Sequence, residues 1–358
     1  MQIYEILKEL RESMALDFDE RAIEFKNYMD ILKLEVTNNP SNIEAYCLMA
    51  MIICELREDS YKSIKILEQC YLENKSSFSN KGFALWATDM AYFLLEECTD
   101  RSEEAELLLT KAINCDSNYA STYYAYGKFC FIKKDFNNAS KLFHKAAEIS
   151  EKKPYKYCEA VSLLANSSQE EGIAILKSIY TYPFESEEID VKIALTLGRA
   201  LALIGEIDEA KKIAQILLKT SYKEFDIEID EMADFMFLLK DYNTCIELYN
   251  KYQFFEDNSW LKKYFYSLKQ IGQTDTAQKK LKEITKKIEK DIIEERMNVE
   301  DWDDYTEYES YICSETKRLK DIQEEYDKIF THSVNIVPDI YYDIYYECYY
   351  IHCPRHYV

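Results

Sequence analysis

The sequence predicts an all-α protein in which pairs of helices stack along one continuous apolar core. Apolar residues recur at helical spacing along most of the 358 residues, beginning with Ile3, Ile6 and Leu7. Only six Gly and five Pro are present, and Pro40 and Gly205 fall between helical patterns. Hydrophobic residues make up 47% of the chain, with 31 Tyr and 17 Phe, so the composition favours a packed core over disorder.

Residues 118–150 show the repeating unit most clearly, as two amphipathic helices joined by a short turn. Small residues stand where the two helices would touch: Gly127 in the first helix, and Ala139 and Ala146 in the second. Aromatic side chains fill the gaps between them, namely Tyr123, Tyr126, Phe136 and Phe143. A single hairpin of this kind exposes too much apolar surface to be stable alone, so it predicts similar neighbours along the chain.

Upstream of this hairpin, the apolar spacing predicts helices over residues 2–13 and 19–38. The second of them should end before Pro40, because the residue that precedes a proline disfavours the helical conformation. Residues 40–70 then contain two further helices, separated by a polar turn near residues 57–60.

The stretch PSNIEAYCLMA, from Pro40 to Ala50, resembles the start of a tetratricopeptide repeat (TPR). In that family a large aromatic residue, a Leu and a Gly or Ala follow one another on the first helix, and Tyr46, Met49 and Ala50 take those places. The family also has a small residue at a fixed position of the second helix. The residues at this position are Ser63, Ala105, Ala139, Gly172, Ala210, Cys245 and Ala277. Their separations of 32 to 42 residues scatter around the TPR period of about 34 residues.

The resemblance implies a right-handed superhelical α-solenoid of about seven TPR-like helical hairpins over residues 40–290. Residues 1–39 would form an N-terminal helical cap or small bundle, and residues 291–358 would form C-terminal capping helices with a Tyr-rich tail. The long helix of the last repeat should continue to about Asn298, and a second long helix is expected over about 303–330. Apolar residues at i, i+3 and i+4 steps predict a final helix over residues 338–351.

In TPR proteins the first helix of each repeat lines a concave groove, which gives this chain a set of candidate partner-binding residues. These are Tyr124, Lys128, Phe131, Lys192, Arg199, Lys262 and Tyr266. A cationic and aromatic groove would suit an acidic peptide, through charge-assisted hydrogen bonds and cation–π contacts. The same side chains are equally expected on ordinary solvated helix faces. Lys128 and Arg199 stand where a chaperone-tail clamp would have Asn, so that partner is not supported.

The formal net charge of −22 argues against a nucleic-acid partner, because phosphate binding requires clustered Lys and Arg. It disfavours an anionic membrane surface for the same reason, and no run of uncharged apolar residues is long enough to span a bilayer. The first 20 residues are charged throughout and lack the apolar core of a secretory signal. Eleven cysteines at irregular spacing, without a CxxC pair, favour reduced thiols in a cytoplasmic protein.

The tail contains four residues of types that bind zinc: Cys348, His352, Cys353 and His356. Their spacing matches no standard zinc module, and the adjacent residues 352 and 353 are awkward ligands for one ion. An aromatic docking helix is the preferred interpretation, so neither a metal nor another cofactor is expected.

The leading functional hypothesis is a scaffold that binds a protein segment or peptide in the groove, and it derives from the family resemblance. The alternative is a ligand-responsive regulator, similar to bacterial TPR proteins whose superhelix changes shape on binding a signalling peptide and releases a target. A helical enzyme is a third, less favoured hypothesis. We expect no catalysis, because the sequence has no GxSxG elbow, phosphate-binding loop or HExxH pair.

Overall fold

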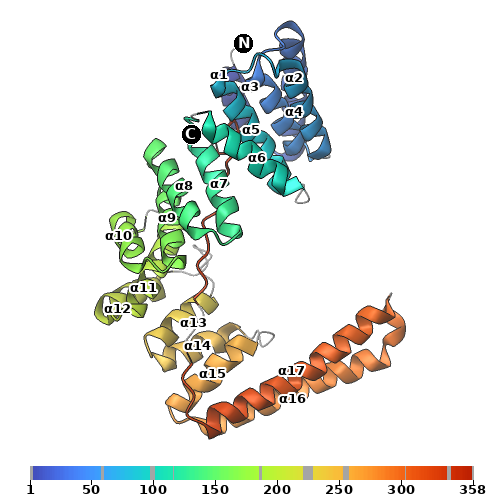
Figure 1. The fold of residues 1–358 in the computed structure, drawn as a ribbon. Coiled ribbons are helices and arrows are strands. Elements are labelled where there is room, and N and C mark those ends of the chain that lie inside the picture. Colours follow the sequence, from blue (N-terminus) through green and yellow to red (C-terminus); the bar gives the residue numbers. More distant parts are fainter. Residues whose placement is uncertain are drawn as a thin grey trace. The chain divides into compact units, whose positions relative to one another are not determined.

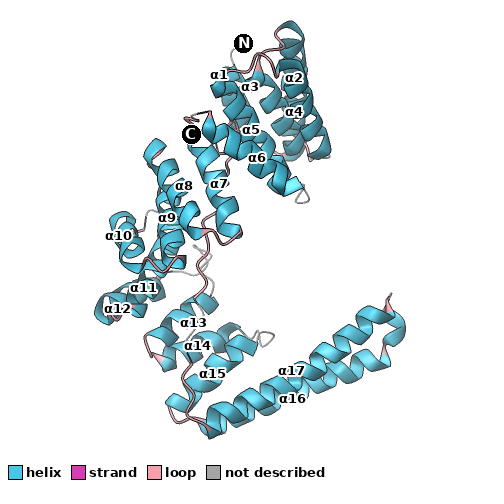
Figure 2. Ribbon diagram, viewed as in Figure 1, coloured by secondary structure: helices cyan, strands magenta, loops and turns pink. Residues whose placement is uncertain are grey.

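The computed structural model describes residues 3–57, 60–96, 101–115, 117–184, 188–220, 229–252, 258–302, 304–336 and 340–356 (Figure 1). Within these ranges all regular secondary structure is helical (Figure 2). The chain forms two compact units. Unit 1 comprises residues 1–179 together with 342–358, and unit 2 comprises residues 180–341.

Unit 1 begins with two helices that cover the first repeat. They are α1 (Ile3–Ser13) and α2 (Phe18–Asn38), and Asp17 caps the second by accepting a hydrogen bond from the backbone N–H of Glu20. Their apolar faces bury Leu10 and Phe25 in one cluster with Leu48 of the first repeat. This packing gives the first repeat the apolar contact that a preceding repeat would otherwise supply.

Four helical hairpins follow in unit 1. They are α3 (Ile43–Glu55) with α4 (Ser60–Asn74), α5 (Asn80–Glu96) with α6 (Ser102–Asn114), α7 (Ala120–Ile132) with α8 (Phe136–Ile149), and α9 (Lys153–Ala165) with α10 (Gln169–Ile179). Lys134, with a φ of 62°, makes the tight turn between α7 and α8, and Asp135 then caps α8.

Unit 2 continues the pattern with three more hairpins. They are α11 (Glu188–Leu203) with α12 (Ile207–Lys219), α13 (Ile229–Leu238) with α14 (Tyr242–Tyr252), and α15 (Asn258–Gln270) with α16 (Thr274–Met297). A 3-10 turn, Val299–Asp301, then leads into α17 (Tyr305–Thr331), which runs back along α16 (Figure 1). The long final pair of helices is therefore as the sequence predicts.

The small residues of the repeat pattern lie in the contacts between paired helices. Those of the second helices are fully buried, as at Ser63, Ala139 and Ala277. A Cβ atom at Gly127 would lie 2.9 Å from two ring carbons of Phe143, which confirms that α7 and α8 approach too closely for a side chain there. The predicted all-α stack of TPR-like hairpins is confirmed. The boundaries predicted at residues 39 and 290 stay a prediction.

The predicted final helix over residues 338–351 is wrong for residues 340–351; residues 338 and 339 lie outside the described ranges. Residues 340–350 are extended, without internal helical hydrogen bonds. Nearly every position of this segment is apolar or aromatic, so its i, i+3, i+4 pattern did not specify one face. Its backbone groups instead find hydrogen-bond partners on the helices of unit 1, as described below.

Replacing Gly127 by Ala should lower the free energy of unfolding by about 1–3 kcal/mol, since the new methyl group would overpack Phe143. The loss should appear although Ala has the higher helix propensity. Chemical denaturation of the single variants and of Gly127→Ala with Phe143→Leu provides a double-mutant cycle. The combined loss should be smaller than the sum of the two single losses, and strict additivity would contradict the packing argument.

Candidate functional site

The tail, residues 342–356, lies against the first helices of the unit 1 hairpins and is extended over residues 342–350 (Figure 1). We call the parts of α3, α5, α7 and α9 that contact it the tail-binding face. An extended segment leaves its backbone N–H and C=O groups without partners of its own, and such groups must be satisfied when they are buried. The tail-binding face supplies partners from side chains.

Tyr124, at the centre of α7, bridges two backbone groups of the tail. Its hydroxyl donates to the carbonyl oxygen of Tyr345 at 2.7 Å and accepts from the N–H of Glu347 at 2.8 Å. The side chain is fully buried, and this burial raises the pKa of Tyr124 well above its usual range. The hydroxyl therefore keeps the proton that it donates. The thiol of Cys158 on α9 donates to the same carbonyl oxygen at 3.5 Å.

Lys128, one turn along α7, holds two tyrosine rings of the tail. Its Nζ lies 4.6 Å from the ring centre of Tyr346 and 5.6 Å from that of Tyr349. The same ammonium group pairs with Glu96 of α5 at 2.5 Å. Glu96 also accepts a hydrogen bond from the hydroxyl of the buried Tyr349 at 2.8 Å. This part of the face thus recognises tyrosine, by both its ring and its hydroxyl.

The tail is also bound by α3 and α5. The hydroxyl of Tyr350 donates to the backbone carbonyl oxygen of Cys47 at 2.5 Å, and its ring packs against Tyr92. The backbone N–H of Ile351 donates to Oδ1 of Asp89 at 2.8 Å. Asp89 is fully buried, and burial raises the pKa of its carboxyl group well above the usual range.

Two ion pairs lie toward the ends of the docked segment. Arg355 binds Glu55 of α3 through two parallel hydrogen bonds of 2.7 and 2.8 Å, and the Glu55 side chain is buried. Lys152, which precedes α9, pairs with Glu347 at 2.7 Å. A bidentate guanidinium–carboxylate pair fixes orientation as well as position.

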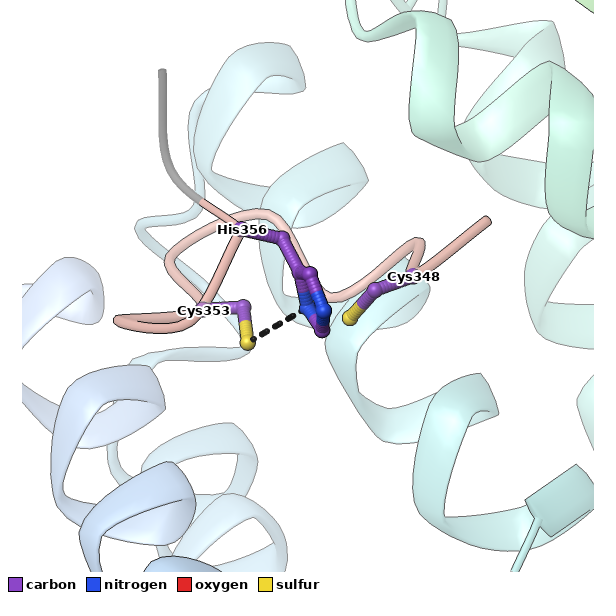
Figure 3. Close-up of side chains that lie close together, drawn as sticks. All are labelled: Cys348, Cys353 and His356. Carbon is purple, nitrogen blue, oxygen red and sulfur yellow. Dashed lines mark hydrogen bonds between the residues drawn. The ribbon is translucent and has the colours of Figure 1, made fainter. Parts of the chain in front are cut away.

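Three metal-ligating side chains meet near the end of the tail (Figure 3). The ligand atoms of Cys348, Cys353 and His356 lie within 4.8 Å of one another, and Sγ of Cys353 is 3.4 Å from Nδ1 of His356. A hydrogen bond from Cys348 lowers the pKa of the Cys353 thiol to about 6, and the same bond raises that of Cys348. His352 is not part of this cluster.

Of the seven predicted groove residues, Tyr124 and Lys128 contact the tail in unit 1. Phe131 packs instead on Phe136 at 5.1 Å, inside its own hairpin. In unit 2, Lys192 is partly exposed on α11. Arg199 is buried, pairs with Glu231 at 3.2 Å, and donates to the carbonyl oxygen of Tyr341 at 3.5 Å.

The last two predicted residues lie in contacts between helices of unit 2. Lys262 on α15 pairs with Glu325 of α17 at 3.1 Å. Tyr266 packs against Phe237 at 5.6 Å and Tyr242 at 6.1 Å.

Sequence reasoning missed the acidic partners of the tail, which are Glu55, Asp89 and Glu96. One signal was present: Asp89 interrupts the otherwise apolar stretch FALWATDMAYFLL. A carboxyl group in such a helix is buried only where it has a hydrogen-bond partner, which here is the tail backbone.

A family model described as Integrator complex subunit 8, TPR repeats, matches residues 20–174, the part of the chain that carries most of the tail-binding face. Residues 20–174 are thus similar in sequence to tetratricopeptide repeats. TPR folds commonly serve as protein–protein interaction scaffolds. A sequence comparison of this chain with curated proteins finds no match.

Several solved structures are similar to this chain. Yeast Tom70 is 14% identical, with a TM-score of 0.41 over 86% of this chain and 61% of that one. Naa15/Naa10 bound to HypK-THB is 11% identical, with a TM-score of 0.36 over 75% of this chain and 39% of that one. The P58(IPK) TPR domain is 11% identical, with a TM-score of 0.22 over 91% of this chain and 99% of that one. This chain thus spans less than two thirds of the length of the Tom70 chain and of the Naa15/Naa10 chain that it matches.

None of the helices in the described ranges is both long enough and apolar enough to cross a membrane.

Replacing Tyr124 by Phe should loosen the tail, because it removes both hydrogen bonds of the bridging hydroxyl. Each contributes about 0.5–1.5 kcal/mol, so amide hydrogen exchange over residues 345–351 should accelerate by about tenfold or more. Tyr123→Phe on the same helix is the matched control and should leave exchange in the tail unchanged. Equal protection in the two variants would contradict the role of the bridge.

Asp89 should make the stability of unit 1 depend on pH. Because its pKa is raised on folding, its stabilising contribution is full below about pH 3.9 and is lost as the pH rises through the raised value. Asn at this position keeps an oxygen acceptor for Ile351 without a charge. The thermal midpoint of Asp89→Asn should therefore rise relative to that of the natural chain as the pH increases above about 3.9, the pKa of an unfolded Asp.

The exposed Asp30→Asn variant controls for the change in net charge. Parallel pH profiles for the natural chain and Asp89→Asn would contradict the buried-carboxyl argument.

Proposed function

We propose that this TPR protein is a protein-interaction scaffold whose tail-binding face takes up an extended, tyrosine-rich peptide segment of a partner. The observation that carries this proposal is the docked tail itself. Tyr124 and Asp89 bind backbone groups of an extended chain, which any peptide of matching shape offers. The face therefore has the chemistry of a peptide-binding surface.

Side-chain contacts define which segment would fit. Lys128 and Glu96 together receive a tyrosine ring and its hydroxyl, Cys47 receives a second tyrosine hydroxyl, and Lys152 receives a carboxylate. The corresponding tail sequence is Tyr345-Tyr346-Glu347-Cys348-Tyr349-Tyr350. Partners are thus expected to carry two adjacent tyrosines, with an acidic residue two positions before the first. This refines the expectation of an acidic peptide, because among the tail contacts described above only that of Lys152 binds a carboxylate of the peptide segment.

Occupation of the face by the chain's own tail gives the second candidate function, that of a ligand-switched regulator. A partner segment must displace the tail, so binding and tail release are linked. In that case the tail sets the threshold for partner binding. A radius of gyration that changes in solution scattering when a peptide binds would favour the regulator, whereas a constant radius would favour a passive scaffold.

The test uses the full chain with its tail weakened by Tyr349→Ala and Tyr350→Ala. A fluorescent synthetic peptide with the sequence of residues 342–356 should bind this variant at least about tenfold more tightly than it binds the natural chain, in which the tail competes. Fluorescence anisotropy measures both affinities. Adding Lys128→Glu to the weakened variant should reduce peptide binding again by about tenfold.

A scrambled peptide of the same composition is the control for non-specific binding of aromatic residues. Equal binding of the two peptides, or an affinity unaffected by Lys128→Glu, would contradict the proposed function.

A further inference from the structure

The side chains of Cys348, Cys353 and His356 form a cluster of possible metal ligands. They take no part in the contacts with the tail-binding face described above. Two thiols and one imidazole are the ligands that Zn²⁺ prefers in proteins, and they also exclude hard cations such as Mg²⁺ and Ca²⁺. All three come from one segment of nine residues, with the pattern Cys-x4-Cys-x2-His.

The distances suit one tetrahedral ion. Zinc lies about 2.3 Å from sulfur and about 2.0–2.1 Å from nitrogen, so neighbouring ligand atoms stand about 3.5–3.8 Å apart. Sγ of Cys353 and Nδ1 of His356 are 3.4 Å apart, and all three ligand atoms lie within 4.8 Å of one another. Small side-chain rotations bring the set to tetrahedral spacing.

The backbone holds this set in place. Residues 351–356 form turns, closed by hydrogen bonds from Cys353 N to Tyr350 O and from His356 N to Cys353 O, each 3.3 Å long. Contacts with unit 1 anchor these turns at both ends, at Tyr350 through Cys47 and at Arg355 through Glu55. Preorganised ligands lower the entropy that metal binding must overcome.

We propose that Cys348, Cys353 and His356 form a zinc-binding site with an open fourth position for water or a partner's side chain. Cys353 is buried whereas His356 is exposed, so the open position faces solvent on the His356 side. The sequence-based objection, that the adjacent residues 352 and 353 are awkward ligands for one ion, does not apply to this ligand set because His352 is not in it. The bound ion would link Cys348, Cys353 and His356 through coordination bonds and so stabilise the turns of the tail.

The test is a titration of the full chain with Co²⁺ under a thiol-free reductant, followed by displacement with Zn²⁺. We expect one ion per chain, with the thiolate-to-cobalt charge-transfer band and the intense visible bands of a tetrahedral site. Cys348→Ser, Cys353→Ser and His356→Ala should each weaken binding by more than about tenfold.

Cys313→Ser and His332→Ala are the matched controls, because both residues are exposed and lie outside the cluster. They should bind cobalt like the natural chain. His356 is exposed, so His356→Ala tests the site without disturbing the buried part of the tail.

Absence of saturable binding, or binding that persists in a Cys348→Ser, Cys353→Ser double variant, would overturn the proposal. So would equal losses in the control variants. The readout is independent of the peptide-binding experiment, so either proposal can fail without the other.

Discussion

The hydrogen-bonding needs of an extended backbone determine how this chain uses its repeats. Residues 340–350 have no helical hydrogen bonds among themselves, yet they are packed among aromatic side chains. The carbonyl and N–H groups of this segment therefore depend on side chains of the repeats. The most important is the hydroxyl of Tyr124, which binds the carbonyl oxygen of Tyr345 and the N–H of Glu347. The cation–π contacts, the ion pairs and the thiol cluster all lie on a segment held by this bridge.

The bridge depends in turn on the close packing of each hairpin. Gly127 lies on the same helix as Tyr124, and its lack of a side chain allows α8 to place the Phe143 ring against α7. That ring also packs on Tyr124, at a centroid distance of 5.6 Å. The residues that define the repeat pattern thus fix the orientation of the side chain that binds the tail.

The hairpins were predictable from sequence because their signals are local: small residues at fixed positions, helical apolar spacing, and Gly or polar turns. Tyr124 and Lys128 could be placed on the binding helix by the register of their repeat. The extended tail could not, because its hydrogen bonds to the repeats join residues 187 to 303 positions apart, as between Cys158 and Tyr345 and between Cys47 and Tyr350. No local pattern records such a contact, and the dense aromatic sequence of the tail mimicked a helix. Asp89 likewise binds the backbone N–H of Ile351 only when the tail is docked.

The most direct test of the account is photocrosslinking of the tail in the full chain. A benzophenone amino acid in place of the half-exposed Tyr346, whose ring lies 4.6 Å from Lys128, reports its neighbours by mass spectrometry. The account predicts intramolecular crosslinks to α5 and α7, around Tyr92 and Lys128. Crosslinks only to other segments, or only between separate chains, would contradict the docking of the tail on unit 1.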